Sequence, residues 1–201
     1  MSQFDRDKWN RKYSHPALIP NEPSPTITRL AKYFPNSGRA LDLAGGAGRH
    51  SIWLAERGLD VTLADVSTAG LELAERRAAD TGVTIETCET DFEPDDSANQ
   101  RSEFPPGPWH LILSHYYDCR ALIPTIIQNL GPAGILIVVQ PTEKNLERSP
   151  KPPRRFLLQE GELRSVASVA SKLEIISYTE AWTDEDRHEA TLVARRPAST
   201  T

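Results

Sequence analysis

Apolar residues change their spacing at regular intervals along the middle of the chain, and this change predicts alternating strands and helices. Short apolar runs bounded by turn residues are typical of buried strands, whereas longer stretches rich in Ala, Leu, Glu and Arg are typical of helices. The expected strands are 39–43, 60–64, 83–88, 109–113 and 135–140. The expected helices between them are 50–56, 69–79 and 121–130. This order indicates βαβ units, a parallel sheet and right-handed crossovers.

The alternation ends near residue 142, and the C-terminal part has a different pattern. A charged, Pro-rich loop at 143–155 leads to an expected helix at 160–171. Two further strands, 173–179 and 190–194, are predicted to pair as an antiparallel hairpin at one edge of the sheet. The expected fold class is therefore α/β and doubly wound, with a mostly parallel seven-stranded sheet and a C-terminal antiparallel edge hairpin.

Turn residues and aromatic residues add detail outside the strands. The run Gly131-Pro132-Ala133-Gly134 predicts a turn before the fifth strand, and the acidic, then Pro-rich stretch 93–108 predicts a surface loop. Near the N-terminus, Phe4, Trp9 and Tyr13 are four or five residues apart, which predicts that they share one side of a short helix.

The composition narrows the class of protein. The 201 residues are enough for one α/β domain with a buried core, and 38% hydrophobic with 25% charged residues is ordinary for a globular chain. The net charge of -5 comes without a basic block, which argues against a nucleic-acid partner. No stretch approaches the ~20 apolar residues of a membrane span, and the polar N-terminus does not resemble a signal peptide. We expect a cytoplasmic monomer or homodimer with no membrane partner.

Cysteine and histidine usage gives no sign of metal or disulfide chemistry. Cys88 and Cys119 are too few and too far apart for a disulfide framework or a zinc cluster, so we interpret them as reduced thiols. The five histidines show no spacing typical of metal ligands. No metal site is expected.

A glycine-rich run lies between the first expected strand and the helix that follows it. The run is Asp42-Leu43-Ala44-Gly45-Gly46-Ala47-Gly48. Glycines suit a sharp turn at which a ligand approaches the backbone, and the amides of the next helix N-terminus favour an anionic group. Asp65 ends the next strand, where an acidic side chain can bind the two ribose hydroxyls of an adenosine. A glycine turn alone is compatible with a tight βα connection, but loop, helix and acidic strand end together indicate a nucleotide-type site.

Two ligands compete for this loop. A dinucleotide site needs G-x-G-x-x-G so that a pyrophosphate lies against the helix, and the third glycine is missing here. Asp42, where the strand leads into the loop, would repel a pyrophosphate but can accept a hydrogen bond from an ammonium group. The loop therefore suits a ligand with an amine and a carboxylate at one end and adenosine at the other, which describes S-adenosylmethionine. An NAD-dependent oxidoreductase is the less favoured alternative.

At these residues the chain resembles the class I S-adenosylmethionine-dependent methyltransferases, whose first motif has the form D-x-G-x-G-x-G. Ala44 replaces the first glycine of that motif, and we expect Gly45 beside it to relieve any backbone strain. Within this family the chain is similar to the tellurite-resistance-type small-molecule methyltransferases. That similarity is carried by Trp9-Asn10-Arg11-Lys12-Tyr13, Asn21-Glu22-Pro23, 155–163 and 187–195. The resemblance implies a Rossmann-like fold and S-adenosyl-L-methionine as the cofactor.

The loop and the resemblance together give a set of expected cofactor-binding residues. These are Asp42, Ala44, Gly45, Gly46, Gly48, His50, Asp65, Val66, Asp91, Phe92, Ser114, Trp9 and Tyr13. The resemblance implies that Asp91 accepts a hydrogen bond from the adenine amino group and that Val66 stacks on adenine. His50 is interpreted as structural or as a contact near the cofactor carboxylate. Trp9 and Tyr13 are either a lid over the cofactor or ordinary packing of an N-terminal helix.

A single methyltransferase domain spanning 1–201 is expected, with three parts. The segment 1–23 is the lid, 39–142 is the cofactor-binding core, and 143–201 is the substrate side. The resemblance implies a small methyl acceptor of the thiol or metalloid-oxyanion class. Methyl transfer from a sulfonium is an in-line displacement, so the protein mainly has to align the reactants and exclude water.

Three residues are candidates for catalysis. His115 either orients the acceptor or is a structural hydrogen bonder, and His188 either faces the acceptor, as the resemblance implies, or is an exposed edge-strand histidine. Arg155 either binds an oxyanion or is simply solvated. A thiolate needs no strong base, whereas a hydroxyl or amine acceptor would need one. A non-catalytic or regulatory binder is a further alternative, because Ala44 is irregular and no base is obvious.

Overall fold

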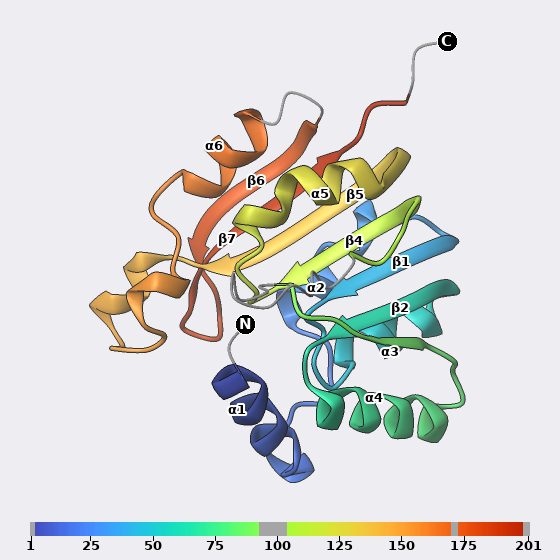
Figure 1. Ribbon diagram of the computed structural model, residues 1–201. Coiled ribbons are helices and arrows are strands. Elements are labelled where there is room, and N and C mark those ends of the chain that lie inside the picture. The colour runs from blue at the N-terminus through green and yellow to red at the C-terminus, as the bar shows by residue number, and fades with distance from the viewer. Residues whose placement is uncertain (1–2, 93–103, 170–172, 199–201) are drawn as a thin grey trace. The chain divides into compact units, whose positions relative to one another are not determined.

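The computed structural model describes residues 3–92, 104–169 and 173–198, and the predicted surface loop at 93–108 therefore lies mostly outside the described residues (Figure 1). The chain separates into two compact units, Met1–Pro108 and Trp109–Thr201.

The first unit is built on three parallel strands in the spatial order β3-β2-β1. The strands are β1 (Gly38–Leu43), β2 (Leu59–Asp65) and β3 (Glu86–Glu89). The helices are α1 (Gln3–Tyr13), α2 (Pro25–Arg29), α3 (Arg49–Glu56) and α4 (Thr68–Thr81), with short 3-10 helices η1 (Pro16–Leu18) and η2 (Ala31–Tyr33). Helix α1 lies beside α4, as Figure 1 shows. The predicted alternation of strands and helices is confirmed here, although β3 is shorter than expected.

Local sequence signals explain where these elements begin and end. Most positions of β1 and β2 are buried on both faces, which is typical of parallel sheets. The Ser67 side chain caps α4 by accepting from the Gly70 amide, and Gly82 ends the same helix in the left-handed conformation. Arg77 of α4 donates to the carbonyl oxygens of Ile19 (2.9 Å) and Ala47 (3.3 Å), which ties the segment after η1 and the glycine loop to this helix.

The second unit is built on four strands in the order β4-β5-β7-β6. The strands are β4 (Trp109–His115), β5 (Leu130–Pro141), β6 (Glu174–Trp182) and β7 (His188–Arg195). The helices are α5 (Ile123–Asn129) and α6 (Glu162–Val169), with 3-10 helices η3 (Arg120–Leu122), η4 (Glu143–Glu147) and η5 (Arg154–Phe156). Strands β4 and β5 are parallel, whereas β7 is antiparallel to both β5 and β6. The predicted seven strands and C-terminal antiparallel hairpin are therefore confirmed, and with them the α/β class.

One predicted turn is wrong. Residues 131–134 belong to β5, whose pairing with β4 begins at Leu130 opposite Trp109 and then shifts register. Gly134 is needed for close approach, because a Cβ there would lie 2.7 Å from the Trp109 carbonyl oxygen. Glycine and proline therefore mark an irregular strand start, with Ala133 at φ 60°. Sequence alone does not distinguish this from a turn.

Among the described residues, no helix is long and apolar enough to cross a membrane.

Candidate active site

The glycine loop joins β1 to α3 and surrounds a buried carboxylate. Asp42, at the end of β1, is 1% exposed and accepts a hydrogen bond from the Ser51 hydroxyl (2.7 Å). A Cβ on Gly45 would lie 2.6 Å from Asp42 Oδ2, so only glycine leaves room for this carboxylate. Gly48 adopts φ 77° at the start of α3, which favours glycine. The other Asp42 oxygen, Oδ1, has no hydrogen-bond partner within the described residues.

A second buried carboxylate, Asp65, ends the neighbouring strand. Its Oδ2 accepts from the Gly46 amide and its Oδ1 from the Ser67 amide, both at 2.8 Å. Each carboxylate oxygen can accept a further hydrogen bond, so Asp65 keeps capacity for ligand hydroxyls. The two carboxylates are thus fixed at the carboxyl ends of adjacent parallel strands, where α/β proteins bind ligands.

Burial makes both carboxylates costly to ionise. Desolvation, opposed by the Ser51 hydrogen bond, raises the pKa of Asp42 from 3.8 to about 7, and the nearby Asp65 charge adds to the rise. Desolvation also raises the pKa of Asp65, against the hydrogen bonds from the Ser67 and Gly46 amides. A cationic ligand placed beside them would be stabilised by both groups, whereas an anionic one would be repelled.

Helix α1 covers the glycine loop. The Tyr13 hydroxyl occupies the space that a Cβ on Gly46 would take, and the Tyr13 ring lies 2.9 Å from the position of a Cβ on Gly70. Asn10 Oδ1 accepts from the Ser67 hydroxyl (2.7 Å) and the Ala69 amide (3.2 Å), which fixes α1 to the start of α4. Desolvation followed by the Asp65 charge raises the pKa of Tyr13, so this phenol stays neutral.

Trp9 lies on the same side of α1 as Tyr13. The two rings are stacked with centroids 5.9 Å apart, and the Lys12 ammonium lies 4.4 Å from the Trp9 centroid. The predicted shared side of the helix is confirmed for these two aromatics. The side chain of Phe4 lies outside the described residues. The structure therefore places Tyr13 at the loop, with Trp9 stacked on it.

Ala44, which replaces a glycine of the motif, has a strained backbone conformation. Its φ is 54°, in the left-handed region that L-residues with a side chain rarely adopt. Gly45 does not have a positive φ, so the expectation that Gly45 relieves the strain is wrong. The Ala44 amide donates to the Ala64 carbonyl oxygen of the neighbouring strand (2.8 Å), and this tertiary contact holds the backbone at the end of β1.

The remaining expected cofactor residues of the first unit lie in two places. Val66 is 4% exposed directly after Asp65, and Asp91 and Phe92 follow β3, with the Phe92 ring 5.8 Å from that of Phe104. His50 is buried, and its Nε2 accepts from the Ser24 amide (3.3 Å) at the start of α2. This contact supports the structural interpretation of His50.

In the second unit, the end of β4 carries Ser114, which was expected to bind the cofactor, and His115, which was a candidate for catalysis. Ser114 is fully buried and donates to the Tyr117 carbonyl oxygen (3.2 Å). The His115 ring stacks on Tyr116 with centroids 3.9 Å apart. Tyr116 has φ 61° and donates its hydroxyl to buried Glu189, and burial with this hydrogen bond raises the pKa of Tyr116. Strained backbone of this kind is concentrated at functional sites.

His188 is not an exposed edge residue. It begins β7, which lies between β5 and β6, and it is 4% exposed. Its Nδ1 is 2.7 Å from the Thr142 hydroxyl, and its backbone exchanges hydrogen bonds with the Asn145 side chain. Desolvation and the Lys144 charge lower the pKa of His188, so the imidazole is neutral at neutral pH.

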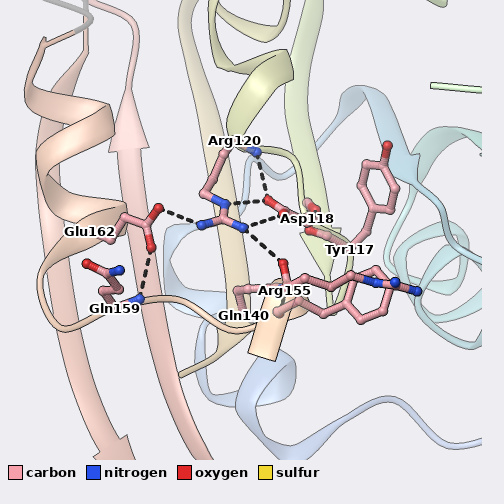
Figure 2. Close-up of polar contacts among 9 residues, drawn as sticks. Tyr117, Asp118, Arg120, Gln140, Arg155, Gln159 and Glu162 are labelled. Atoms are coloured by element: carbon pink, nitrogen blue, oxygen red, sulfur yellow. Dashed lines mark hydrogen bonds and ion pairs between the residues drawn. The ribbon is translucent and has the colours of Figure 1, made fainter. Parts of the chain in front are cut away.

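Arg155 lies on η5, with its guanidinium 4.7 Å from the Phe156 ring centroid. Figure 2 shows its side chain pointing away from Arg120 and toward the side on which Tyr117 lies. Arg120 itself contacts Asp118, Glu162 and the Arg155 backbone. Sequence reasoning had assigned Arg155 a role but not Arg120.

Several residues of these sites were not identified from the sequence. Asn10 and Gly70 act through contacts between α1 and α4, and Glu189 acts through Tyr116. Ser67 was missed as well, although it carried a usable sequence signal as a helix-capping residue two positions after Asp65. Among the described residues, no group of three or more His, Cys, Asp or Glu side chains could hold a metal ion.

Comparison with known proteins gives the family. Residues 40–134, which include the glycine loop, Asp65, Asp91 and β4, match the family described as methyltransferase domain. Residues 40–134, just under half of the chain, therefore carry a methyltransferase domain, and this match agrees with the predicted methyltransferase.

Solved structures agree on the fold. TehB from Haemophilus influenzae is 23% identical with a TM-score of 0.66, covering 95% of this chain and 66% of TehB. Magnesium protoporphyrin IX methyltransferase from Synechocystis PCC 6803, solved with bound S-adenosylmethionine, is 14% identical with a TM-score of 0.69, covering 96% of this chain and 95% of that one. At these identities the likeness concerns the fold alone.

Among curated proteins, the tRNA 5-carboxymethoxyuridine methyltransferase of Escherichia coli K12 is 32% identical over 109 residues. The match covers 53% of this chain but only 41% of that protein. The chain therefore spans less than half the length of this curated relative.

Replacing Ala44 with glycine is expected to increase the free energy of unfolding by about 1 kcal/mol. A left-handed φ costs an L-residue roughly 1–2 kcal/mol, and the greater freedom of glycine in the unfolded chain offsets part of this gain. Urea unfolding measures the change. Ala47→Gly is the matched control. Ala47 is in the same loop but does not have a positive φ, so this variant should have a lower free energy of unfolding than wild type. A less stable Ala44→Gly protein would contradict the strain at Ala44.

The raised pKa of Asp42 predicts that the free energy of unfolding falls between about pH 4 and pH 7. In this range the unfolded chain has released a proton that the folded protein keeps, so stability decreases as pH rises, by up to about 1.4 kcal/mol per pH unit. Asp65 contributes in the same direction. Asp42→Asn cannot ionise and should have a shallower slope in urea unfolding at several pH values. Exposed Asp60→Asn is the control, and equal slopes for wild type and Asp42→Asn would refute the assignment.

Proposed function

We propose that this protein is an S-adenosylmethionine-dependent methyltransferase that acts on a small nucleophile of the thiol or metalloid-oxyanion class. The observation that supports this most directly is the pair of buried carboxylates, Asp42 and Asp65, fixed around a glycine loop. The family match to residues 40–134 supports the same reaction. We propose that the chain works as one methyltransferase domain.

The charges of the loop fit S-adenosylmethionine better than a dinucleotide. The ligand carries a sulfonium and an ammonium group, and it supplies an electrophilic methyl carbon when bound. Asp42 Oδ1, buried without a partner among the described residues, is an acceptor available to a donor such as the ammonium group. The remaining acceptor capacity of Asp65 suits ribose hydroxyls. NAD would place a pyrophosphate beside two carboxylates, which is unfavourable.

The contacts of α1 support a role for Tyr13 as one wall of the cofactor site. Gly46 and Gly70 both lack a side chain where the Tyr13 ring and hydroxyl lie, so this packing is possible only with glycine at both positions. Trp9, stacked on Tyr13, extends the same aromatic surface. We propose that this surface excludes water from the cofactor, as in-line transfer requires.

On the acceptor side, the residues available suit an acceptor that arrives as a soft anion. His188 is neutral and buried. Its imidazole can therefore accept a proton or a hydrogen bond, and it carries no positive charge that would pair with the anionic acceptor. Arg155 offers a guanidinium for an oxyanion, and His115 stacks beside Tyr116. Such an acceptor needs alignment more than deprotonation, which fits a site without an exposed strong base.

A nucleic-acid acceptor is the second candidate, because the curated relative is named as a tRNA methyltransferase. Lys151, Arg154 and Arg155 are exposed on the segment that follows β5, although Arg154 pairs with Glu143 and the net charge of the chain is -5. The absence of a nucleic-acid partner therefore stays a prediction, as do the cytoplasmic location and the oligomeric state. A non-catalytic binder stays a third alternative.

Isothermal calorimetry with S-adenosylhomocysteine tests the cofactor site. Wild type is expected to bind, and Asp65→Ala should bind at least about tenfold more weakly, because a hydrogen bond to a charged group contributes roughly 1.5–3 kcal/mol. Asp60→Ala, an exposed acid on the same strand, is the matched control and should bind like wild type.

A wild-type protein that binds no S-adenosylhomocysteine at millimolar concentration would refute the proposed function. Binding of NAD in place of S-adenosylhomocysteine would favour the oxidoreductase instead.

Transfer of labelled methyl groups to a panel of acceptors tests the acceptor class. We expect methylation of at least one of a small thiol, selenite or tellurite, and none of tRNA. Methylation of tRNA alone would replace the small-acceptor proposal, and cofactor binding without any transfer would favour the regulatory binder. His188→Ala should lower transfer by about tenfold or more if the imidazole contacts the acceptor.

A further inference from the structure

The 3-10 helix η5 is attached to the carboxyl end of β5. The Leu158 amide donates to the Pro141 carbonyl oxygen (3.0 Å), and the Glu143 amide donates to that of Leu158 (2.9 Å). Carboxyl ends of parallel strands are where α/β proteins bind their ligands. Arg155 lies on η5, between η4 and Leu158 in the sequence, and its side chain is exposed. No carboxylate pairs with its guanidinium in the part of the chain that the structure describes.

A helix this short cannot satisfy its own last carbonyl groups. The Leu157 amide bonds back to the Arg154 carbonyl oxygen, which leaves those of Arg155 and Phe156 to other donors. Two side chains from elsewhere in the second unit supply them. Arg120 Nη2 donates to the Arg155 carbonyl oxygen (3.3 Å), and Gln140 Nε2 donates to that of Phe156 (2.8 Å).

Arg120 is itself held rigidly. It binds Asp118 through Nε (2.7 Å) and Nη2 (2.5 Å), and it binds Glu162 of α6 through Nη1 (2.5 Å), as Figure 2 shows. The hydrogen bonds that Arg120 donates to Asp118 raise the pKa of Arg120, so the guanidinium stays charged. Both carboxylates are only partly exposed, which strengthens these ion pairs relative to surface pairs.

Gln140 is similarly constrained at the end of β5. It is 4% exposed, and its Oε1 has no hydrogen-bond partner within the described residues. A buried acceptor without a partner is unfavourable, and such groups in proteins are commonly paired with water or ligand. The bond from Nε2 to the Phe156 carbonyl oxygen therefore ties η5 to a side chain that is itself buried at the end of β5.

We propose that Arg120 and Gln140 are positioning residues that hold η5 so that Arg155 presents its guanidinium to an anionic oxygen group of the methyl acceptor. The proposal rests on the proposed function. Arg120 and Gln140 fix two successive carbonyl groups, which sets the direction of the Arg155 side chain before the acceptor arrives. Pre-organised groups bind more tightly because less freedom is lost on binding.

A double-mutant cycle measured by calorimetry tests this, with selenite as the oxyanion probe and protein saturated with S-adenosylhomocysteine. Arg155→Ala is expected to weaken selenite binding about tenfold through loss of a charge-assisted contact. Arg120→Ala should weaken binding about fivefold alone but less than about twofold in the Arg155→Ala background, because the two residues act on one contact. Gln140→Leu leaves the Arg120 ion pairs intact, and it should weaken selenite binding in the same pattern as Arg120→Ala. It replaces Arg120→Ala in the cycle if that variant does not fold.

Arg154→Ala is the matched control, because it removes a neighbouring exposed arginine that pairs with Glu143 and should leave selenite binding unchanged. Equal losses from Arg120→Ala or Gln140→Leu with and without Arg155 would overturn the proposal, since that result shows a general structural role. Wild type that binds S-adenosylhomocysteine but not selenite would also overturn it. Failure to bind S-adenosylhomocysteine would instead refute the proposed function.

Discussion

Two carboxylates must be kept in the interior at the carboxyl ends of β1 and β2, and the first unit is organised around this constraint. Asp42 and Asp65 are each at most 5% exposed, and burial of charge is tolerated only where donors compensate it. The compensation comes from the loop and helix starts, through the Ser51 hydroxyl and the amides of Gly46 and Ser67. Glycine at 45 follows from the same constraint, because a side chain there would meet Asp42.

The constraint extends to α1, which the sequence presents only as an aromatic segment. Asn10 bonds to the residues that start α4, and Tyr13 fills the space above Gly46. The glycines at 46 and 70 thus serve the packing of a tyrosine as well as a ligand. The packing of Tyr13 therefore explains why glycine occupies position 70 in the first turn of α4.

In the second unit, side chains stabilise irregular backbone at the carboxyl ends of β4 and β5. The strained φ of Tyr116 is accompanied by its bond to Glu189, and the segment after β5 is fixed by Thr142, Asn145 and His188. Arg120 and Gln140 do the same for η5. Arg120, Gln140 and Asn145 each place a buried or ion-paired side chain against a backbone carbonyl group.

The sequence by itself determined the strands and helices, the glycine loop, Asp42 and Asp65, because apolar spacing, turn residues and a short motif are local signals. It also indicated the family, through the same motif. Tertiary structure decided the rest. The burial of His188 depends on β7 lying inside the sheet, the extension of β5 over 131–134 depends on close approach to Trp109, and the strain at Ala44 depends on its bond to Ala64. Arg120 reaches η5 across 35 residues of sequence, and Asn10 reaches Ala69 across 59, so neither contact leaves a pattern that spacing could reveal.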